Sequence, residues 1–489
     1  MLQSEIFERA RLSRDARFDG QFYVGVKTTG IYCRPICPAN SPKSENVSFF
    51  QSAAAASEAG YRPCLRCRPE SAPGTPAWSG TSTTVRRGLR LISGGALDDG
   101  NVEELAERLG VTSRHLRRLF NKHVGASPLS VAHTQRLHFA KRLIDETTLP
   151  MQHIAAAAGY GSIRRFNDAF RNTYGRSPRA LRRAGEELGH VGPAANLTVR
   201  LPYRQPFHWH RMIEFYRYRA TPGVESVDGD VYRRTLATGD SHAIVEISPD
   251  SKDGYLSMTM LSIDTDVLFD TVQAAREVFD LDAPVSEIAA TLGRDKTLKQ
   301  MLKQNPGVRV PGAWDGFELT VRAVLGQQVS VKAATTMAGR IAEKYGEPIA
   351  LPDTIERAGL ARIFPTPERL SRARFNGIGL IRSRAETIRQ VAKAVVSGDV
   401  RFDPAQNPDT FCEALQSIRG IGDWTAAYVA MRVLKNPDAL PASDLGLISA
   451  IRHPDRVTPK ELIETAETWR PWRAYAAMLL WGSLPGSGG

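Results

Sequence analysis

The sequence is poor in cysteine and has no long apolar run. Only five of its 489 residues are cysteines, and four of them fall between positions 33 and 67. Secreted scaffolds held together by disulfides use far more cysteine, so we expect a reducing, cytoplasmic setting. No apolar stretch approaches the roughly 18 residues that a membrane span requires, and the charged N-terminal residues lack the pattern of a signal peptide. We therefore expect no membrane among the partners.

Acidic residues are scarce in the first part of the chain. Residues 1–190 hold 28 Lys and Arg against 17 Asp and Glu, whereas the remaining 299 residues hold 36 against 35. Most of this excess lies in residues 80–185, which have 18 basic and 8 acidic side chains. A local basic excess is the usual footprint of phosphate binding, although a solvated Arg-rich surface has the same composition. We therefore expect nucleic-acid contacts in this segment.

The length predicts about three domains, at roughly 150 residues each. Two stretches rich in Pro, Gly, Ser or Thr, Ser71–Thr83 and Ala184–Ala195, are typical of linkers, and the tail "GSLPGSGG" is expected to be disordered. We predict these segments: 1–72, 83–184, a β-rich part at 196–275 and a helical part at 276–483.

The four clustered cysteines are spaced C-x3-C-x26-C-x2-C, at Cys33, Cys37, Cys64 and Cys67. Two close pairs separated by a loop suit a tetrahedral zinc site, because each short turn can direct two thiolates at one metal ion. Such a site can be a purely structural clasp for a domain too small to be stable alone. We expect one Zn²⁺ and no organic cofactor, and the spacing leaves the choice between clasp and reagent open.

The basic segment contains two related helical units. "NVEELAERLGVTSRHLRRLFNKHVG" has apolar residues at helical spacing on both sides of a turn at Gly110. "MQHIAAAAGYGSIRRFNDAFRNTYG" repeats this arrangement with its turn at Gly159, and Ser162 is an expected helix N-cap. A helix around Ser127–Asp145 joins the two units.

The C-terminal part begins with alternating, strand-like stretches: "LTVRLPY", "GDVYRRTLA", "HAIVEIS" and "YLSMTMLS". After about Thr271 the pattern becomes helical. "LQSIRGIGDWTAAYVAMRVL" then places Gly420 and Gly422 between two amphipathic helices. These glycines let backbone amides and a helix N-terminus approach a DNA phosphate, as in a helix-hairpin-helix motif.

Residues 1–70 closely resemble the N-terminal domain of the Ada family of DNA methylation-damage response proteins. The resemblance is carried by "VKTTGIYCRPIC", "ENVSFF" and "AGYRPCLRCRP". It implies that Cys33 accepts a methyl group from a methylated DNA phosphate, while the other three cysteines hold the metal. Full-length Ada proteins also carry a methyltransferase domain with a "P-C-H-R" motif. The fifth cysteine here, Cys412 in "TFCEAL", is expected to be buried in a helix instead.

The two helical units resemble the AraC-type DNA-binding domain, whose closing pattern "GY…F…F…G.SP…R" begins at Gly159 and ends at Arg182. The resemblance implies that the second helix of each unit enters the major groove of double-stranded DNA. Many of the arginines there can serve by contacting phosphate alone, which positions the protein without reading the base sequence. The expected DNA-contacting residues are Ser113, Arg114 and Arg117 in the first unit and Ser162, Arg164, Arg165 and Asn167 in the second.

Residues 196–482 resemble the AlkA-type 3-methyladenine DNA glycosylases, through the hairpin, "RAVLGQQVSVKAA", "PASDLGL" and "WRPWRAYAAMLLW". The family's catalytic carboxylate falls on Asp444, which from the sequence alone could equally be a helix N-cap. The wedge that fills the gap left by a flipped base falls on Gln328, where the best-known relatives have leucine. Related enzymes that also cut the strand have a lysine at or near Trp424. The expected base pocket consists of Trp424, Tyr428 and Trp481.

These resemblances predict a multidomain chain. It combines a small zinc-bound α/β domain, an all-α double helix-turn-helix domain, and an α+β glycosylase domain with a small antiparallel sheet and a helix-hairpin-helix. We expect it to accept methyl groups from DNA, to activate transcription with RNA polymerase as a partner, and to excise alkylated purines without cutting the strand. Two helix-turn-helix units in one chain favour a monomer.

Two alternatives stay open. The first is a transcription factor with a purely structural zinc site and a non-catalytic damage-binding domain. The second is an oxidised-base glycosylase/lyase of the same superfamily, which the missing hairpin lysine disfavours.

Overall fold

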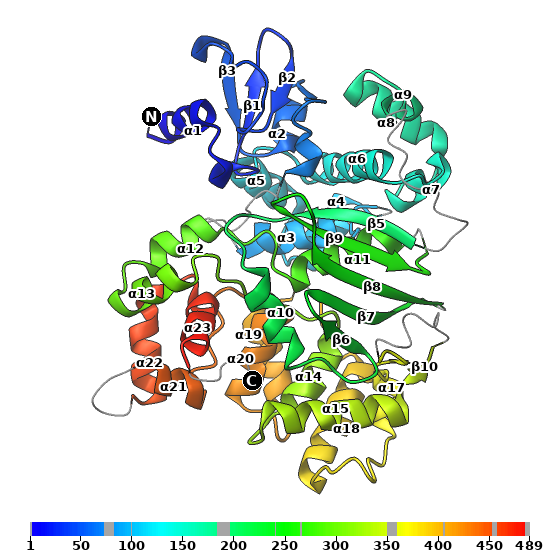
Figure 1. Cartoon of the computed structure of the whole chain (residues 1–489), viewed down its shortest axis with the longest axis vertical. Coiled ribbons are helices and arrows are strands. Elements are labelled where there is room, and N and C mark those ends of the chain that lie inside the picture. The colour runs from blue at the N-terminus through cyan, green and yellow to red at the C-terminus, as the bar shows by residue number, and fades with distance from the viewer. Residues whose placement is uncertain are drawn as a thin grey trace. The chain divides into compact units, whose positions relative to one another are not determined.

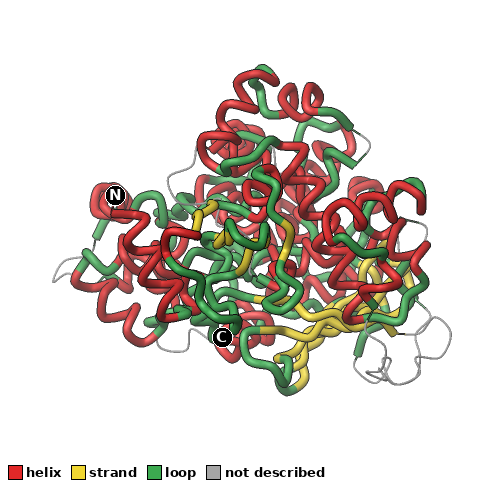
Figure 2. The backbone as a smooth tube through the Cα atoms, turned by 90° about the horizontal axis from the view of Figure 1, so that it is seen from above, coloured by secondary structure: helices red, strands yellow, loops and turns green. Residues whose placement is uncertain are grey.

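The computed structural model describes residues 2–72, 83–98, 100–182, 196–239, 241–264, 267–349, 359–403, 406–451 and 457–484. Both predicted linkers lie almost wholly outside these residues, and so does the C-terminal tail from residue 485 on. The first residue of the tail, Gly482, still belongs to a helix (Arg473–Gly482). Contacts group the chain into two compact units, the first with residues 1–205, 250–276 and 281–284 and the second with 206–249, 277–280 and 285–489. Helix is the prevailing element (Figure 2). Among the described residues, no helix is long and apolar enough to span a membrane. The four-part division expected from the sequence stays a prediction.

The N-terminal part of the first unit is a four-stranded sheet in the order β3-β1-β2-β4 (Figure 1). β1 pairs antiparallel with β2 and β3, whereas β2 pairs parallel with β4. Four consecutive buried alanines let helix α2 pack closely against the sheet. The elements are α1 (Leu2–Ser13), β1 (Tyr23–Val26), β2 (Ile31–Cys33), β3 (Val47–Phe50), α2 (Ala53–Glu58) and β4 (Arg62–Pro63).

The two predicted helix-turn-helix segments follow, and both lie within the first compact unit of the chain. The turn of the first is at Gly110, whose φ is +70°, and that of the second is at Gly159, whose φ is +72°. Leu105, Leu116 and Phe120 are almost completely buried in the first helix-turn-helix segment, as the helical spacing predicts. The elements are α3 (Thr83–Ser93), α4 (Val102–Arg108), α5 (Ser113–His123), α6 (Pro128–Glu146), α7 (Met151–Ala157), α8 (Ile163–Tyr174) and α9 (Pro178–Leu181).

The expected β-rich part contributes to both units. β5 (Asn196–Pro202) pairs antiparallel with β9 (Tyr255–Leu261) in the first unit, and α11 (Leu268–Val278) follows. In the second unit, β7 (Val231–Thr238) pairs antiparallel with β6 (Glu225–Asp228) and β8 (Ser241–Pro249). A helix that the strand pattern did not predict, α10 (Trp209–Arg217), precedes β6 and buries Trp209, Met212, Ile213 and Tyr216.

The remainder of the second unit is mostly helical. Its main core packs α14, α15, α18, α19 and α20 together. The elements are α12 (Val285–Leu292), α13 (Lys296–Gln304), α14 (Gly316–Leu325), α15 (Val331–Tyr345), β10 (Glu347–Pro348), β11 (Arg362–Ile363), α17 (Pro367–Ser371), α18 (Arg382–Ser397), α19 (Pro408–Gln416), α20 (Asp423–Arg432), α21 (Leu445–Ala450), α22 (Pro459–Ala466) and α23 (Arg473–Gly482).

Four charges, three of them buried and that of Arg322 half-buried, join the strands of the second unit to α14. Glu225 lies 2.7 Å from Arg234 and 2.9 Å from Arg322, and Glu318 pairs with both arginines as well. Burial alone would raise the pKa of Glu225, but the two guanidinium groups outweigh it and lower the pKa to about 2. Each buried charge therefore has fixed partners of opposite sign, which is the condition for tolerating it away from water.

Replacing Glu225 by Gln should lower the free energy of unfolding of the second unit by about 3 kcal/mol, because the two arginines then share one carboxylate. Glu246→Gln, which breaks a more exposed pair with Arg233 at 2.5 Å, should cost less than about 1 kcal/mol. Urea unfolding measures both.

Because the pKa of Glu225 is depressed below its ordinary 4.5, its stabilisation is complete above that pH and declines as the pH falls toward 2. Glu225→Gln should therefore flatten the acid limb of the stability curve. If Glu225→Gln and Glu246→Gln lowered the free energy of unfolding equally, burial of Glu225 would not be the source of its stabilisation.

Candidate metal centre and active site

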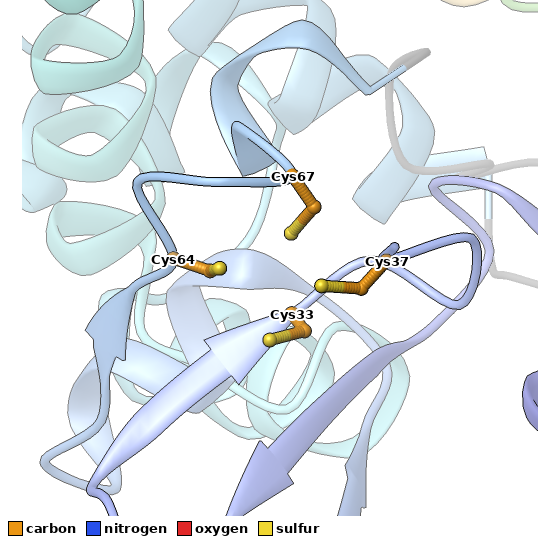
Figure 3. A group of neighbouring side chains, drawn as sticks. All are labelled: Cys33, Cys37, Cys64 and Cys67. Atoms are coloured by element: carbon orange, nitrogen blue, oxygen red, sulfur yellow. The ribbon is translucent and has the colours of Figure 1, made fainter. Parts of the chain in front are cut away.

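The four cysteines of the sequence motif converge in the first unit (Figure 3). Cys33 ends β2, and the parallel pairing of β2 with β4 brings Cys64 beside it through the bond from the Cys64 amide to the Tyr32 carbonyl, 3.0 Å long. The four sulfur atoms lie within 4.8 Å of one another. Tetrahedral Zn–S bonds of about 2.3 Å require sulfur atoms about 3.8 Å apart, so the donor set fits Zn²⁺.

Backbone and side-chain donors of Arg34 support the cluster. The Arg34 amide donates to the Cys67 sulfur at 3.3 Å, and its guanidinium donates to the Cys67 carbonyl at 3.2 Å while pairing with Asp19. Cys64 and Cys67 are buried, whereas Cys33 and Cys37 are half-exposed. An incoming reagent can therefore reach the first pair of sulfurs more easily than the second.

The metal-binding segment is tied to α6, the helix that links the two helix-turn-helix units. Arg68, one residue after the last ligand, lies 2.8 Å from Asp145 on α6, and Asp145 also pairs with Lys141 at 2.5 Å. Burial lowers the pKa of His138 to about 3, so its imidazole is neutral and forms a 2.9 Å hydrogen bond with the Tyr32 hydroxyl. The metal segment and the linking helix therefore share charged and polar contacts.

The predicted base-contacting residues lie on or next to the second helix of each helix-turn-helix segment. Arg114 and Arg117 are exposed on α5, although Arg117 is paired with Glu103 at 2.9 Å. On α8, Arg164 and Arg165 are exposed and Asn167 is half-exposed. Ser113 opens α5. Ser162 occupies the N-cap position of α8, but its side chain makes no capping hydrogen bond, unlike the expected cap.

The second unit contains a cavity of about 490 Å³ that includes the predicted carboxylate. Asp444 caps α21 by accepting from the Leu447 amide at 2.9 Å. Its Oδ1 also accepts from the Trp481 indole N–H at 2.8 Å, and its Oδ2 from the Trp424 indole N–H at 2.7 Å. Asp444 is therefore a helix cap and a cavity carboxylate at once.

The three predicted pocket aromatics all line this cavity. Trp424 and Tyr428 stack with ring centroids 5.1 Å apart and planes 9° apart, and Tyr428 meets Trp481 edge-on at 6.3 Å. An electron-rich surface of this kind attracts a cationic ring more strongly than a neutral one. The two tryptophans also orient the carboxylate, a role that the sequence did not indicate.

Sequence reasoning missed several residues that line the cavity, among them Phe215 on α10, Arg219 just after it, and Arg432 at the end of α20. Arg432 follows Tyr428 by one helical turn, as Tyr428 follows Trp424, so its spacing was a usable signal. Phe215 and Arg219 precede the hairpin by about 200 residues, and no local pattern marks them. Burial alone would raise the pKa of the Tyr428 phenol, but Arg432 and Arg219 outweigh it, and the pKa is lowered.

The hairpin and the predicted wedge loop are connected. Gly420 has a φ of +97°, and Gly422 is the N-cap of α20. Gln327 donates to the Gly420 carbonyl at 2.9 Å and to the Thr425 hydroxyl at 3.1 Å. Gln328, the next residue, is exposed and has a φ of +56°, which a residue other than glycine rarely adopts. This strained backbone presents its side chain to solvent beside the hairpin.

Cys412 does not resemble a reactive thiol. It is half-buried on α19 rather than fully buried, and burial raises the pKa of its thiol to about 11. A thiol with that pKa stays protonated at neutral pH, and the thiolate is the nucleophilic form.

Four families match the chain in succession. "Metal binding domain of Ada" matches residues 7–70, "Helix-turn-helix domain" 105–184, "AlkA N-terminal domain" 198–315 and "HhH-GPD superfamily base excision DNA repair protein" 321–474. The zinc site and DNA as a partner, both expected from the sequence, are thereby confirmed. Fold and sites define the class: a DNA-binding regulator with a metal centre, joined to a helix-hairpin-helix base-excision repair protein.

The relatives specify the family. The "Probable bifunctional transcriptional activator/DNA repair enzyme AlkA" of Mycobacterium tuberculosis is 40% identical over 480 residues, covering 97% of this chain and 95% of the relative. "DNA-3-methyladenine glycosylase 2" of Escherichia coli is 33% identical over 285 residues, covering 58% and 95%. "Bifunctional transcriptional activator/DNA repair enzyme Ada" of Escherichia coli is 39% identical over 117 residues, covering 24% and 32%. The chain belongs to the family of bifunctional Ada/AlkA-type transcriptional activators and DNA repair enzymes.

Gly420→Ala should weaken binding of the second unit to DNA by about tenfold or more. A Cβ atom at Gly420 would overlap the Thr387 hydroxyl on α18, and alanine is strained at a φ of +97°. Gly422→Ala should cost less, because it keeps the backbone amide and its Cβ would meet no protein atom within 4 Å. Fluorescence anisotropy with an undamaged duplex measures both variants, and equal affinities would exclude a hairpin geometry that depends on Gly420.

Proposed function

We propose that the second unit hydrolyses the N-glycosidic bond of alkylated purines such as 3-methyladenine in double-stranded DNA. The observation that carries this proposal is the carboxylate of Asp444, held by the indole N–H groups of Trp424 and Trp481 in a cavity with an aromatic wall. The target nucleotide must leave the duplex to reach such a cavity. Gln328 fills the gap that it leaves, and the amides at Gly420 and Gly422 hold a phosphate.

Asp444 acts on the sugar rather than on the base. As the bond between C1′ and the purine nitrogen breaks, its electrons go to the alkylated base, which becomes neutral, and positive charge develops on the sugar. The fixed carboxylate stabilises that charge. Water then adds to C1′ and releases a proton, leaving an abasic site. Trp424 has no amine and cannot form a Schiff base, so the strand stays intact, unlike in the lyase alternative.

The proposal for the first unit is that Cys33 accepts a methyl group from a DNA methyl phosphotriester. It is supported by the half-exposed Cys33 at the end of β2 and by the match to the Ada metal-binding domain. The bond from the methyl carbon to the phosphate oxygen breaks, a bond from that carbon to sulfur forms, and the phosphate becomes an ordinary diester anion. Bound Zn²⁺ keeps the thiols deprotonated at neutral pH.

Methylation changes the charge of the centre. With Zn²⁺ held by the four cysteines, four thiolates would give the centre a formal charge of −2, and a thioether at Cys33 would leave −1. Repulsion between the centre and the DNA backbone falls, so binding by the adjacent helix-turn-helix units becomes stronger. RNA polymerase is the proposed next partner, and the chain acts as a monomer because its two reading helices are already joined.

Mass spectrometry of the zinc-loaded protein after incubation with methylated duplex DNA tests the acceptor. We expect one added methyl group, on the peptide that contains Cys33, and none in Cys33→Ser. Cys37 is the other half-exposed ligand, so a methyl group on the Cys37 peptide would reassign the acceptor. An unmodified protein with zinc bound would reduce the site to a structural clasp.

Asp444→Asn should abolish excision of 3-methyladenine, with a loss of about a thousandfold or more, because it removes the charge that stabilises the sugar. Asparagine still caps α21, so folding and binding to damaged DNA should persist. Base release and strand cleavage are measured on one labelled duplex. Undiminished release would refute the role of Asp444, and strand cleavage by the unaltered protein would favour the lyase alternative.

A further inference from the structure

The wall of the active-site cavity carries charge of opposite sign at its two ends. Trp424, Tyr428 and Arg432 follow one another at intervals of four residues and therefore share one face of α20. Trp424 donates to Asp444, and the Tyr428 hydroxyl accepts from Arg432 at 2.7 Å. The Arg432 guanidinium carbon lies 5.3 Å from the centroid of the Tyr428 ring, which stacks on Trp424 with centroids 5.1 Å apart. The Asp444 carboxylate and the Arg432 guanidinium are therefore bonded to opposite members of the Trp424–Tyr428 stack.

A second arginine reinforces the cationic end. The guanidinium carbons of Arg219 and Arg432 lie 4.1 Å and 4.9 Å from the centroid of the Phe215 ring. All three residues line the same cavity as Asp444. Arg219 and Arg432 therefore converge on one aromatic ring of the cavity lining, and Arg432 is bonded to Tyr428 rather than to an indole that holds Asp444.

Neither of these arginines is neutralised by an acid in the described part of the chain. Arg432, only 4% exposed, donates to the carbonyls of Pro311 and Gly312 at 2.9 Å and 2.7 Å and to Tyr428. Arg219 donates to the Phe215 carbonyl at 3.2 Å. Glu214 also lines the cavity, and its one ion pair within the described ranges is with His210, at 3.9 Å.

Arg322 lines the same cavity and is half-buried, but it has acidic partners. It pairs with Glu225 at 2.9 Å and with Glu318 at 3.0 Å. Arg432 is buried and Arg219 is half-buried, and neither has such a partner among the described residues. Withdrawing a cation from water without an acid costs free energy, so retaining both against the cavity points to a role in what the cavity binds.

Charge moves along this axis during the reaction. The alkylated base enters the cavity with a positive charge, which the arginines disfavour. As the glycosidic bond breaks, that charge passes to the sugar, closer to Asp444 and farther from the arginines. The transition state therefore gains from both ends of the cavity, while the bound substrate gains from one and loses from the other. Interactions that are stronger in the transition state than in the substrate complex raise the rate of the chemical step.

We propose that Arg219 and Arg432 supply an oriented positive field that drives positive charge out of the alkylated base and toward Asp444 as the glycosidic bond breaks. This inference rests on the proposed glycosylase function. It assigns the arginines to catalysis rather than to affinity, because they act against binding of the cationic base and in favour of its departure as a neutral one.

Single-turnover excision from a duplex with one 7-methylguanine tests the field, since the fitted rate constant and the half-saturating protein concentration separate chemistry from binding. Arg219→Met should lower the rate constant by about tenfold or more, with the half-saturating concentration unchanged or smaller. Arg219→Lys keeps the charge and should restore most of the rate. Arg217→Met, an exposed position on α10 outside the cavity lining, should match the unaltered protein.

The possible outcomes separate this inference from the function on which it rests. A larger half-saturating concentration with an unchanged rate constant would make Arg219 a binding residue and overturn the proposal. Equal losses in the rate constant for Arg219→Met and Arg219→Lys, at an unchanged melting temperature, would also overturn the proposal. Asp444→Asn is measured in parallel. If it is inactive while Arg219→Met retains the full rate, the field fails and the glycosylase stands; if Asp444→Asn is fully active, the proposed function fails first.

Discussion

Charge held away from water by fixed partners is the constraint on which both units depend. A buried ion is tolerated only where opposite charges or hydrogen-bond donors stand ready for it. In the first unit, the four cysteine sulfurs lie within 4.8 Å of one another, so a metal cation must stand between them if they are to be thiolates. In the second, Glu225 and Glu318 neutralise Arg234 and Arg322, and Asp444 has three N–H donors. At the two sites where we expect chemistry, the compensating partner is a metal ion for the four cysteines and a set of neutral N–H groups for Asp444.

The surroundings of Asp444 show how few side chains are needed to hold such a charge. Each indole contributes a single N–H to the carboxylate and a broad ring to the cavity wall. One backbone amide completes the arrangement because the carboxylate also begins α21. Folding of that short helix therefore fixes the position of the two carboxylate oxygens. The residues that hold the carboxylate also form part of the cavity wall, namely Trp424 and Trp481.

Local spacing in the sequence predicted the parts of the sites that local structure determines. Cys33 and Cys37 share one turn, Gly420 and Gly422 share one hairpin, and the second helix of each helix-turn-helix unit follows its glycine turn. The resemblance to glycosylases then pointed to Asp444. Phe215 and Arg219 could not be predicted in this way, because they follow from the packing of α10 against helices far along the chain. The strand pattern also missed α10 itself, whose buried face became evident only from the tertiary contacts.

The contacts between the metal segment and α6 have a consequence for how DNA is surveyed. Arg68 follows the last metal ligand and pairs with Asp145, and Tyr32, which precedes the first ligand, is bonded to His138. These contacts hold the four-cysteine centre to the helix between the two helix-turn-helix units. In the proposed function, the methylated phosphate then lies at a constant offset from the base pairs that those units contact. In the proposed function, detection of a methylated phosphate and recognition of a base sequence therefore take place at a fixed distance from each other along the duplex.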